Sequence, residues 1–150
     1  MSDAPRRRAI IPEGVAEAAR AAGMSPAICS GTHLFLTGIT GSGPDGAMPA
    51  DPVAQFRAVF EKAAGVLDAA GLTLDALVEM TSYHIGLRDH FEAFDTLRRE
   101  VLSEPYPAWT AVEVAGLRRP GAVVEVRFIA QTERALERSQ ATPSPSRSSR

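Results

Sequence analysis

Cysteine is nearly absent from this sequence, and its scarcity limits the chemistry that the protein can perform. Of 150 residues, only Cys29 carries a thiol. A single thiol excludes an internal disulfide framework and a zinc cluster built from cysteines. No pair of histidines has the spacing of helical metal ligands, so we expect neither a metal nor another cofactor. Cys29 is predicted to be a small buried residue rather than a nucleophile.

Long hydrophobic runs and a surplus of one charge are also missing. No apolar stretch approaches the roughly 20 residues of a membrane helix. No apolar stretch follows the three arginines at 6–8, as a secretory signal would require. We therefore expect a cytoplasmic protein that does not bind membranes. The 16 basic and 18 acidic residues give a net charge of −2, which argues against nucleic-acid binding, because phosphate neutralisation needs a positive surplus.

The composition that remains is typical of one globular domain. Hydrophobic residues make up 45 % of the chain and charged residues 23 %, which is enough to form a core. The last segment, 138–150, is rich in Ser, Pro and Arg and has no large apolar residue. We predict that this tail is disordered, since it has nothing to bury. The predicted domain is therefore 1–137.

Hydrophobic periodicity predicts the element order β-β-β-α-β-α-β-β. The first helix begins at Asp51 as N-cap and ends at Gly71. The second begins near Asp89 and stops before Pro105. Its residues 98–100 are predicted to form a solvated face. The glycine-rich segment 38–46 is predicted to be a loop. The six strands are expected at 8–11, 27–30, 33–37, 78–87, 109–114 and 122–130.

This order predicts an α+β sandwich, in which a mixed sheet carries both helices on one face. The other face of the sheet would then be uncovered. Alternating valines in the last two strands suggest that the uncovered face is apolar: Val112, Val114, Val124 and Val126. A small domain with such a face usually buries it against a copy of itself. We therefore expect a homo-oligomer.

Several segments together resemble the Rid family (reactive intermediate deaminase, also called the YjgF family). The block 107–117, PAWTAVEVAGL, is followed at the expected distance by VEVRFIA at 124–130. Further matching positions are the LFLTG segment at 34–38, Gln55 with the LDAAGL segment at 67–72, and Phe91 with Phe94. The resemblance covers residues 9–133, nearly all of the predicted domain.

The resemblance implies a chorismate-mutase-like fold and a trimer whose sheets form an inner barrel. Ligand clefts would lie between subunits. Typical members hydrolyse enamines and imines derived from amino acids to 2-oxo acids and ammonia, without a cofactor. The expected partners are therefore a small molecule and two further copies of the chain.

The family's site residues are only partly present in this chain. Trp109 stands where the family has an arginine that grips the substrate carboxylate, and Met24 stands near a family tyrosine. Asp95 corresponds to a family asparagine. Thr37 keeps the hydroxyl of the family serine, and Glu125 keeps the acidic residue thought to orient or activate water. The resemblance therefore implies that water handling is retained and that the carboxylate clamp is lost.

Each candidate residue has an alternative interpretation. Glu125 is either a general acid or base or an exposed residue near a strand end. Arg127, two residues along the same strand, either pairs with Glu125 or replaces the lost anion contact. Trp109 either stacks on a planar ligand or packs at a subunit interface. His84 faces either the cleft or the helix layer.

Three functions follow from these residues. The first is a hydrolase or deaminase of a reactive imine or enamine that is not a plain 2-imino acid, with Glu125 and Thr37 as catalytic residues. Substrate contacts would come from Trp109, Arg127, Met24, Asp95 and His84. The second is a trimeric module that binds a small molecule without turning it over. The third, ribonuclease activity, is disfavoured by the acidic charge balance.

Overall fold

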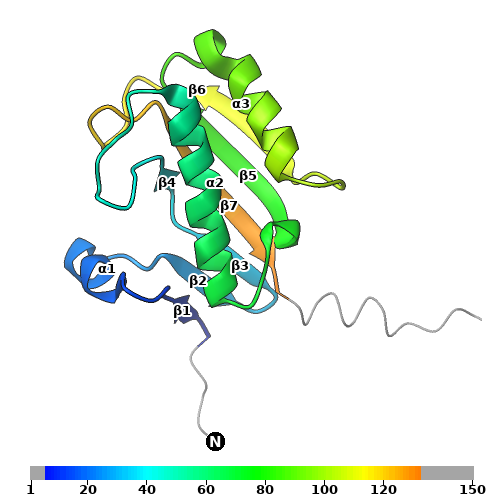
Figure 1. Ribbon diagram of the computed structural model, residues 1–150. Helices are drawn as coiled ribbons and strands as arrows, with labels where there is room; N and C mark the ends of the chain where they lie inside the picture. Colours follow the sequence, from blue (N-terminus) through cyan, green and yellow to red (C-terminus); the bar gives the residue numbers. More distant parts are fainter. Residues whose placement is uncertain (1–5, 133–150) are drawn as a thin grey trace, which may run out of the picture.

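A single mixed sheet organises the chain. The computed structural model describes residues 6–132 (Figure 1). The strands run in the order β1-β2-β3-β7-β5-β6, and β4 pairs with the remaining length of β7. All neighbours are antiparallel except β5 and β6, which are parallel. The bounds are β1 Arg8–Ile10, β2 Ala27–Ser30, β3 His33–Leu36, β4 Ile39–Thr40, β5 Leu77–His84, β6 Ala108–Glu113 and β7 Val124–Gln131.

The two long helices, α2 (Pro52–Ala69) and α3 (Leu87–Val101), lie side by side on one face of this sheet (Figure 1). Asp51 caps α2 by accepting a hydrogen bond of 3.0 Å from the backbone N–H of Val53, as the sequence predicts. The crossover through α3 joins the parallel strands β5 and β6. The predicted α+β architecture with both long helices on one face is confirmed. The sheet is open along its edges, with β1 at one edge and β6 at the other.

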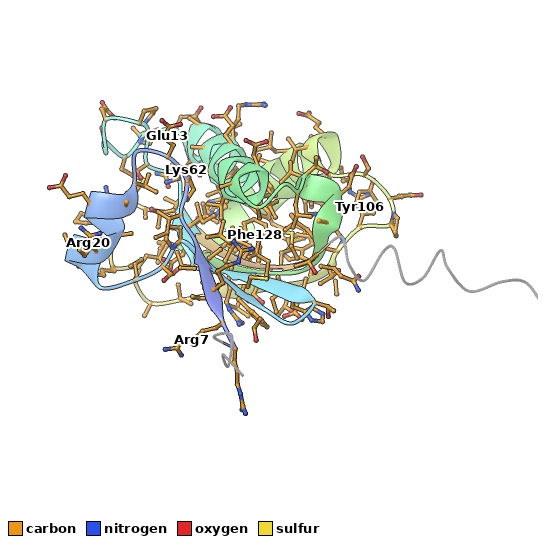
Figure 2. All side chains as sticks on the ribbon, turned by 90° about the horizontal axis from the view of Figure 1, so that it is seen from below. Arg7, Glu13, Arg20, Lys62, Tyr106 and Phe128 are labelled. Carbon is orange, nitrogen blue, oxygen red and sulfur yellow. The ribbon has the colours of Figure 1, made fainter. Side chains whose placement is uncertain are left out.

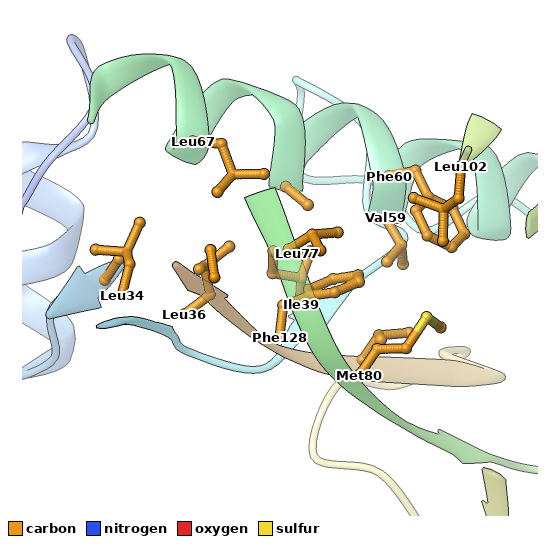
Figure 3. Packing of buried hydrophobic residues seen from close by; sticks show 14 of the residues in the cluster. Leu34, Leu36, Ile39, Val59, Phe60, Leu67, Leu77, Met80, Leu102 and Phe128 are labelled. Carbon is orange, nitrogen blue, oxygen red and sulfur yellow. The ribbon is translucent and has the colours of Figure 1, made fainter. Parts of the chain in front are cut away.

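The core fills the space between these helices and the sheet (Figure 3). Phe60 of α2, Phe94 of α3 and Phe128 of β7 form its centre, with ring centroids about 6 Å apart. Phe60 and Phe128 meet edge to face, and such a contact stabilises the core beyond the burial of its area. Each long helix therefore joins the sheet through the aromatic residues of its predicted apolar stripe.

The structure contains elements that the sequence interpretation missed. A helix, α1 (Ala16–Ala22), precedes β2, and a turn of 3-10 helix, η1 (Leu74–Ala76), precedes β5. The alanine-rich run before Gly23 favours α1. Gly23 ends it in the left-handed conformation, with φ of 67°. The predicted loop 38–46 contains the short strand β4 at its beginning.

Two predictions about α3 are wrong. The helix begins at Leu87 after Gly86, not near Asp89. Arg98 is buried, with 6 % of its surface exposed, and does not belong to a solvated face. Its guanidinium lies 4.4 Å from the ring centroid of Trp109, so the long side chain packs against the indole instead of pointing into water.

The uncovered face of the sheet also differs from the prediction. Val124 and Val126 are fully buried and face the helices. Because strand residues alternate between faces, Glu125 and Arg127 lie on the uncovered face. Thr81 and Tyr83 of β5 are their partners across the strand pair. Val112 of β6 pairs with Tyr83 and so lies on the uncovered face, as predicted. This face therefore mixes charged, hydroxyl and apolar side chains, and only part of the predicted valine set lies on it.

A break in pairing along β7 positions one end of this face. Phe35 of β3 pairs with Ile129, and Ile39 of β4 pairs with Val126. Three residues, 36–38, thus stand opposite two residues of β7. An extra residue of this kind bends the strand and redirects its side chains. Thr37 and Gly38 lie at this bend, which separates β3 from β4.

A buried glutamine fixes the loops around the bend. The side-chain amide of Gln55 donates to the carbonyl oxygens of Pro49 and Gly121, at 2.7 and 2.9 Å. Its Oε1 accepts from the N–H of Val123 at 2.9 Å. Gln55 therefore satisfies three backbone groups from two loops that are far apart in the sequence. Gly41, which follows β4, packs directly on the backbone of α2 at this residue.

Candidate functional site

The predicted site residues separate into two groups on opposite faces of the sheet. Thr37, Glu125 and Arg127 belong to the bend and to the uncovered face. Met24 joins Thr37 through a weak contact of 3.9 Å between the hydroxyl Oγ1 and the thioether Sδ. The remaining predicted residues, Trp109, His84 and Asp95, lie in the helix-facing layer.

The Glu125 carboxylate lies against Gly38 at the bend. A β-carbon at position 38 would lie 3.1 Å from both the carboxyl carbon and Oε1 of Glu125. Glycine at this position therefore leaves room for the side chain in its observed place. Glu125 is half-buried and stands opposite Thr40 on one side and Tyr83 on the other. A carboxylate so placed can exchange a proton with a water or ligand at the bend.

Arg127 lies on the same face as Glu125 but forms no ion pair with it. Within residues 6–132, the only salt bridges are those of Asp95 with Arg98 and with Arg99. Arg127 is exposed. The predicted alternative of a simple Glu125–Arg127 pair is therefore not observed, and the Glu125 carboxylate has no guanidinium on it.

Trp109 packs within its own chain. Its indole stacks on the ring of Phe91, with centroids 5.6 Å apart and planes 3° from parallel. Its Nε1 donates to Oγ of Ser82 at 2.8 Å. The indole N–H therefore already has a partner, and Arg98 and Phe91 both contact the ring.

Asp95 is held by two arginines of its own helix. Its carboxylate accepts from Arg98 and, at 3.0 Å, from Arg99. The hydrogen bond from Arg98 is the main cause that lowers the pKa of Asp95. Asp95 thus orients the buried guanidinium over Trp109. The sequence interpretation assigned Arg98 to solvent. Asp95, which lies one turn earlier on the same helix, was the available sign that Arg98 has an ion-pair partner.

His84 faces the helix layer, which settles the alternative left by the sequence. It is fully buried, and Nε2 lies 2.8 Å from Oγ of Ser82. Among the residues that the structure describes, Nδ1 has no hydrogen-bond partner, and neither does the buried Nε2 of the neighbouring His90. Burial, and secondarily His90, lowers the pKa of His84 from 6.5 to about 4. His84 is therefore neutral near pH 7.

Other residues of the described segment bear on the kind of site. Cys29 packs against the core. No group of three or more His, Cys, Asp or Glu side chains converges on a common point within the described segment. None of the described helices is long and apolar enough to cross a membrane. The lysine of the chain, Lys62, was not singled out from the sequence, yet it lines a cavity that reaches Thr37 and Gly38.

Comparison with known proteins places the sequence and the fold in a family. The sequence model described as Endoribonuclease L-PSP matches residues 15–132. RutC family protein YjgH of Escherichia coli strain K12 is 40 % identical over 108 residues, which cover 71 % of this chain and 81 % of that protein.

Solved structures agree with the sequence comparison. The structure of protein YjgH superposes with a TM-score of 0.77 at 36 % identity and covers 85 % of this chain and 97 % of its own. RidA from an Antarctic Psychrobacter species gives a TM-score of 0.69 at 30 % identity, over 81 % of this chain and 94 % of its own. From the matched sequence and the shared fold, we conclude that this chain belongs to the Rid/YjgF family, the family of the Endoribonuclease L-PSP model.

Proposed function

We propose that the protein hydrolyses a reactive imine or enamine at the bend formed by Thr37, Gly38 and Glu125. The observation that carries this proposal is the Glu125 carboxylate, which lies against Gly38 and has no arginine partner among residues 6–132. Family membership supplies the reaction class. The half-buried position of Glu125 supplies a group that takes up and returns protons.

The proposed reaction needs only water as co-reactant. Water adds its oxygen to the carbon of the C=N bond while Glu125 accepts a proton from that water. The proton then passes to the nitrogen, which gives a carbinolamine. Glu125 next moves the proton of the new hydroxyl group to the nitrogen, and the carbon–nitrogen bond breaks to give a carbonyl compound and ammonia. An enamine first gains a proton on carbon and becomes the imine. The Thr37 hydroxyl orients the attacking water or the nitrogen.

The substrate of this proposal is not a plain 2-imino acid. An arginine grips a carboxylate with two parallel N–H donors. Trp109 has one N–H, and that group donates to Ser82. The indole is also held in place by Phe91 and Arg98. Trp109 therefore gives no carboxylate clamp beside the C=N bond.

The proposal includes a homotrimer in the cytoplasm, with the uncovered sheet faces turned toward one another. Glu125, Arg127, Thr81 and Tyr83 would then line the boundary between subunits. Their mixture of charge, hydroxyl and apolar surface suits a subunit boundary that also holds water and a small ligand. No nucleic acid or membrane is part of the proposal.

Hydrolysis of a panel of imines tests the reaction. An amino-acid oxidase generates 2-imino acids in place, and other imines are formed from aldehydes or ketones with ammonia. We expect faster decay than in buffer for imines that lack an adjacent carboxylate, and little acceleration for 2-imino acids. A protein that accelerates no imine in the panel would contradict the proposal. Acceleration of 2-imino acids equal to that of an arginine-containing relative would contradict the substrate assignment.

A non-catalytic binding module is the second candidate function. It is favoured by Trp109, which stands where the family has the arginine that grips the substrate carboxylate and which packs within its own chain. Trp109 is the only tryptophan of the chain, so its fluorescence reports on this region. An imine or planar compound that raises the melting temperature and changes the fluorescence, yet decays no faster, would support the module over the enzyme.

A further inference from the structure

A cavity of about 340 Å³ opens beside the bend, between α2 and the segment that precedes α1. Thr37, Gly38 and Thr40 line one wall, and Lys62 and Val66 of α2 line another. Pro12 and Val15, just before α1, line a further side, and the cavity stays open to solvent. The lining comes from five separate segments of the chain, one of which carries Thr37 and Gly38 of the proposed site.

Two cationic side chains converge on this cavity. Nζ of Lys62 donates to Oγ of the buried Ser42 at 3.0 Å. Arg119, from the loop between β6 and β7, donates to the carbonyl oxygen of Gly46 at 2.8 Å. These contacts hold both side chains at the cavity while leaving N–H groups on each for a further acceptor. The hydroxyls of Thr37, Thr40 and Ser42 add donors to the same lining.

The positive charge of the cavity is not neutralised within the described chain. None of the described residues that line the cavity is Asp or Glu. The salt bridges of residues 6–132 all involve Asp95, far along the chain in α3. Glu13, which Figure 2 labels in the same region, is exposed and is not part of the lining.

The positive charges of Lys62 and Arg119 repel each other. Burial is the main cause that lowers the pKa of Lys62, and repulsion from Arg119 lowers it further. Like charges beside each other in a half-buried site are unfavourable until an anion binds between them. An anion that bridges the two cations would form charge-assisted hydrogen bonds with both.

We propose that this cavity binds a compact anionic group, a carboxylate or a phosphate, through Lys62 and Arg119. The inference rests on the proposed function in one respect, since Thr37 and Gly38 line both the cavity and the proposed site. It makes the substrate an anionic imine or enamine whose charged group is held from the α2 side. Lys62 lies on α2 and Arg119 on the loop between β6 and β7, whereas Trp109, which stands at the position of the family arginine, lies on β6.

Calorimetric titration with inorganic phosphate and with pyruvate tests the anion site on the full chain in a buffer without competing anions. The variants are Lys62→Met and Arg119→Gln, and Arg118→Gln is the matched control because Arg118 is exposed and lies outside the lining. We expect the wild type and the control to bind at least one probe. Each cavity variant should bind about tenfold more weakly or worse, as expected for loss of a charged hydrogen bond.

The two probes distinguish the sources of the anion. Binding of pyruvate alone assigns a carboxylate, and binding of phosphate alone assigns a phosphate ester. Failure of the wild type to bind either probe would overturn the proposal. Equal binding by wild type, Lys62→Met and Arg119→Gln would also overturn it, by placing the anion elsewhere.

Chemical labelling gives a second readout that does not depend on folding of a variant. Lys62 is the sole lysine of the chain, so an amine-specific reagent labels one side chain besides the α-amino group. We expect a bound probe to slow labelling of Lys62, followed by peptide mass spectrometry. Imine hydrolysis is measured separately. Protection of Lys62 without imine hydrolysis would support the anion site and reject the proposed function. Imine hydrolysis without protection of Lys62 and without binding of a probe would support the proposed function and reject the anion site.

Discussion

Single titratable residues of this protein serve different purposes: Glu125 is placed for proton transfer, whereas His84 contributes to packing. Glu125 has an unpaired carboxylate at the bend, whereas His84 is buried among aromatic rings with one nitrogen unpartnered. The sequence could not distinguish these environments, because both residues lie in predicted strands with alternating neighbours. The difference depends on which face of the sheet the helices cover. His84 is therefore better described as a packing residue with an electrostatic cost than as a ligand contact.

The burial of His84 predicts a pH-dependent stability. Its folded pKa of about 4 lies below the value of 6.5 that the unfolded chain is expected to have. The unfolded state therefore binds more protons between these values, and stability falls as the pH drops from 6.5 toward 4. The slope contributed by His84 approaches about 1.4 kcal/mol per pH unit. The lowered pKa of His90 acts in the same direction.

Urea unfolding at pH 7.5, 6, 5 and 4.5 measures this slope. The variant His84→Gln should show a flatter decline of the unfolding free energy, even if its stability at pH 7.5 is lower. His33→Gln, at an exposed strand position, is the matched control and should keep the wild-type profile. An unchanged slope in His84→Gln would show that His84 is not the group responsible.

At the scale of elements, close contact between the loop after β4 and α2 fixes the bend. A β-carbon at position 41 would lie 2.4 Å from the Cα and the carbonyl oxygen of Gln55. A helix backbone cannot move aside as a flexible side chain can. Gln55 in turn holds the loops at Pro49 and Gly121. The segment that carries Thr37 and Gly38 is thus anchored by backbone packing on α2.

Two glycine-to-alanine variants test this anchoring. Gly41→Ala should lower the unfolding free energy by about 2–3 kcal/mol, because overpacking against a rigid backbone forces a shift. Gly65→Ala, inside α2, meets no atom within 4 Å. It should raise stability by about 0.5–1 kcal/mol through helix propensity. Denaturant midpoints measure both, and a neutral Gly41→Ala would contradict the close contact.

The sequence predicted elements well where periodicity and caps agreed. Asp51 and Gly71 marked the ends of α2. The sequence did not predict the features that tertiary contacts determine. The two-residue strand β4 exists only because β7 offers a partner, and Arg98 is buried only because Trp109 lies beneath α3. Thr37 and Glu125 were selected through family resemblance, and their proximity required the structure.

At the scale of the whole molecule, the uncovered sheet face is the surface that an assembly would use. Its residues include Phe35, Ile129 and Tyr83 together with charged neighbours. The anion cavity lies on the α2 side instead. Subunit contact is thus assigned to the uncovered sheet face and anion binding to the α2 side, and the two regions meet at Thr37 and Gly38 of the bend.

Light scattering after size exclusion tests the proposed trimer. We expect a mass of about 48 kDa, three times the 15.9 kDa of the chain. Ile129→Glu places a charge on the uncovered face and should lower the mass, whereas Arg57→Glu, at an exposed position of α2, should not. A wild-type mass near that of one chain would reject the trimer.

The central claim is that Glu125 at the bend performs the chemistry. The most direct measurement is kcat/KM for the best imine of the panel, in the wild type and in Glu125→Gln, with Glu79→Gln as the control. Glu79 is an exposed glutamate of the adjacent strand β5. The account predicts a loss of about 10²-fold or more in Glu125→Gln, as for removal of a general acid–base group, and wild-type activity in Glu79→Gln. Equal activity in all three proteins, each folded by circular dichroism, would contradict it.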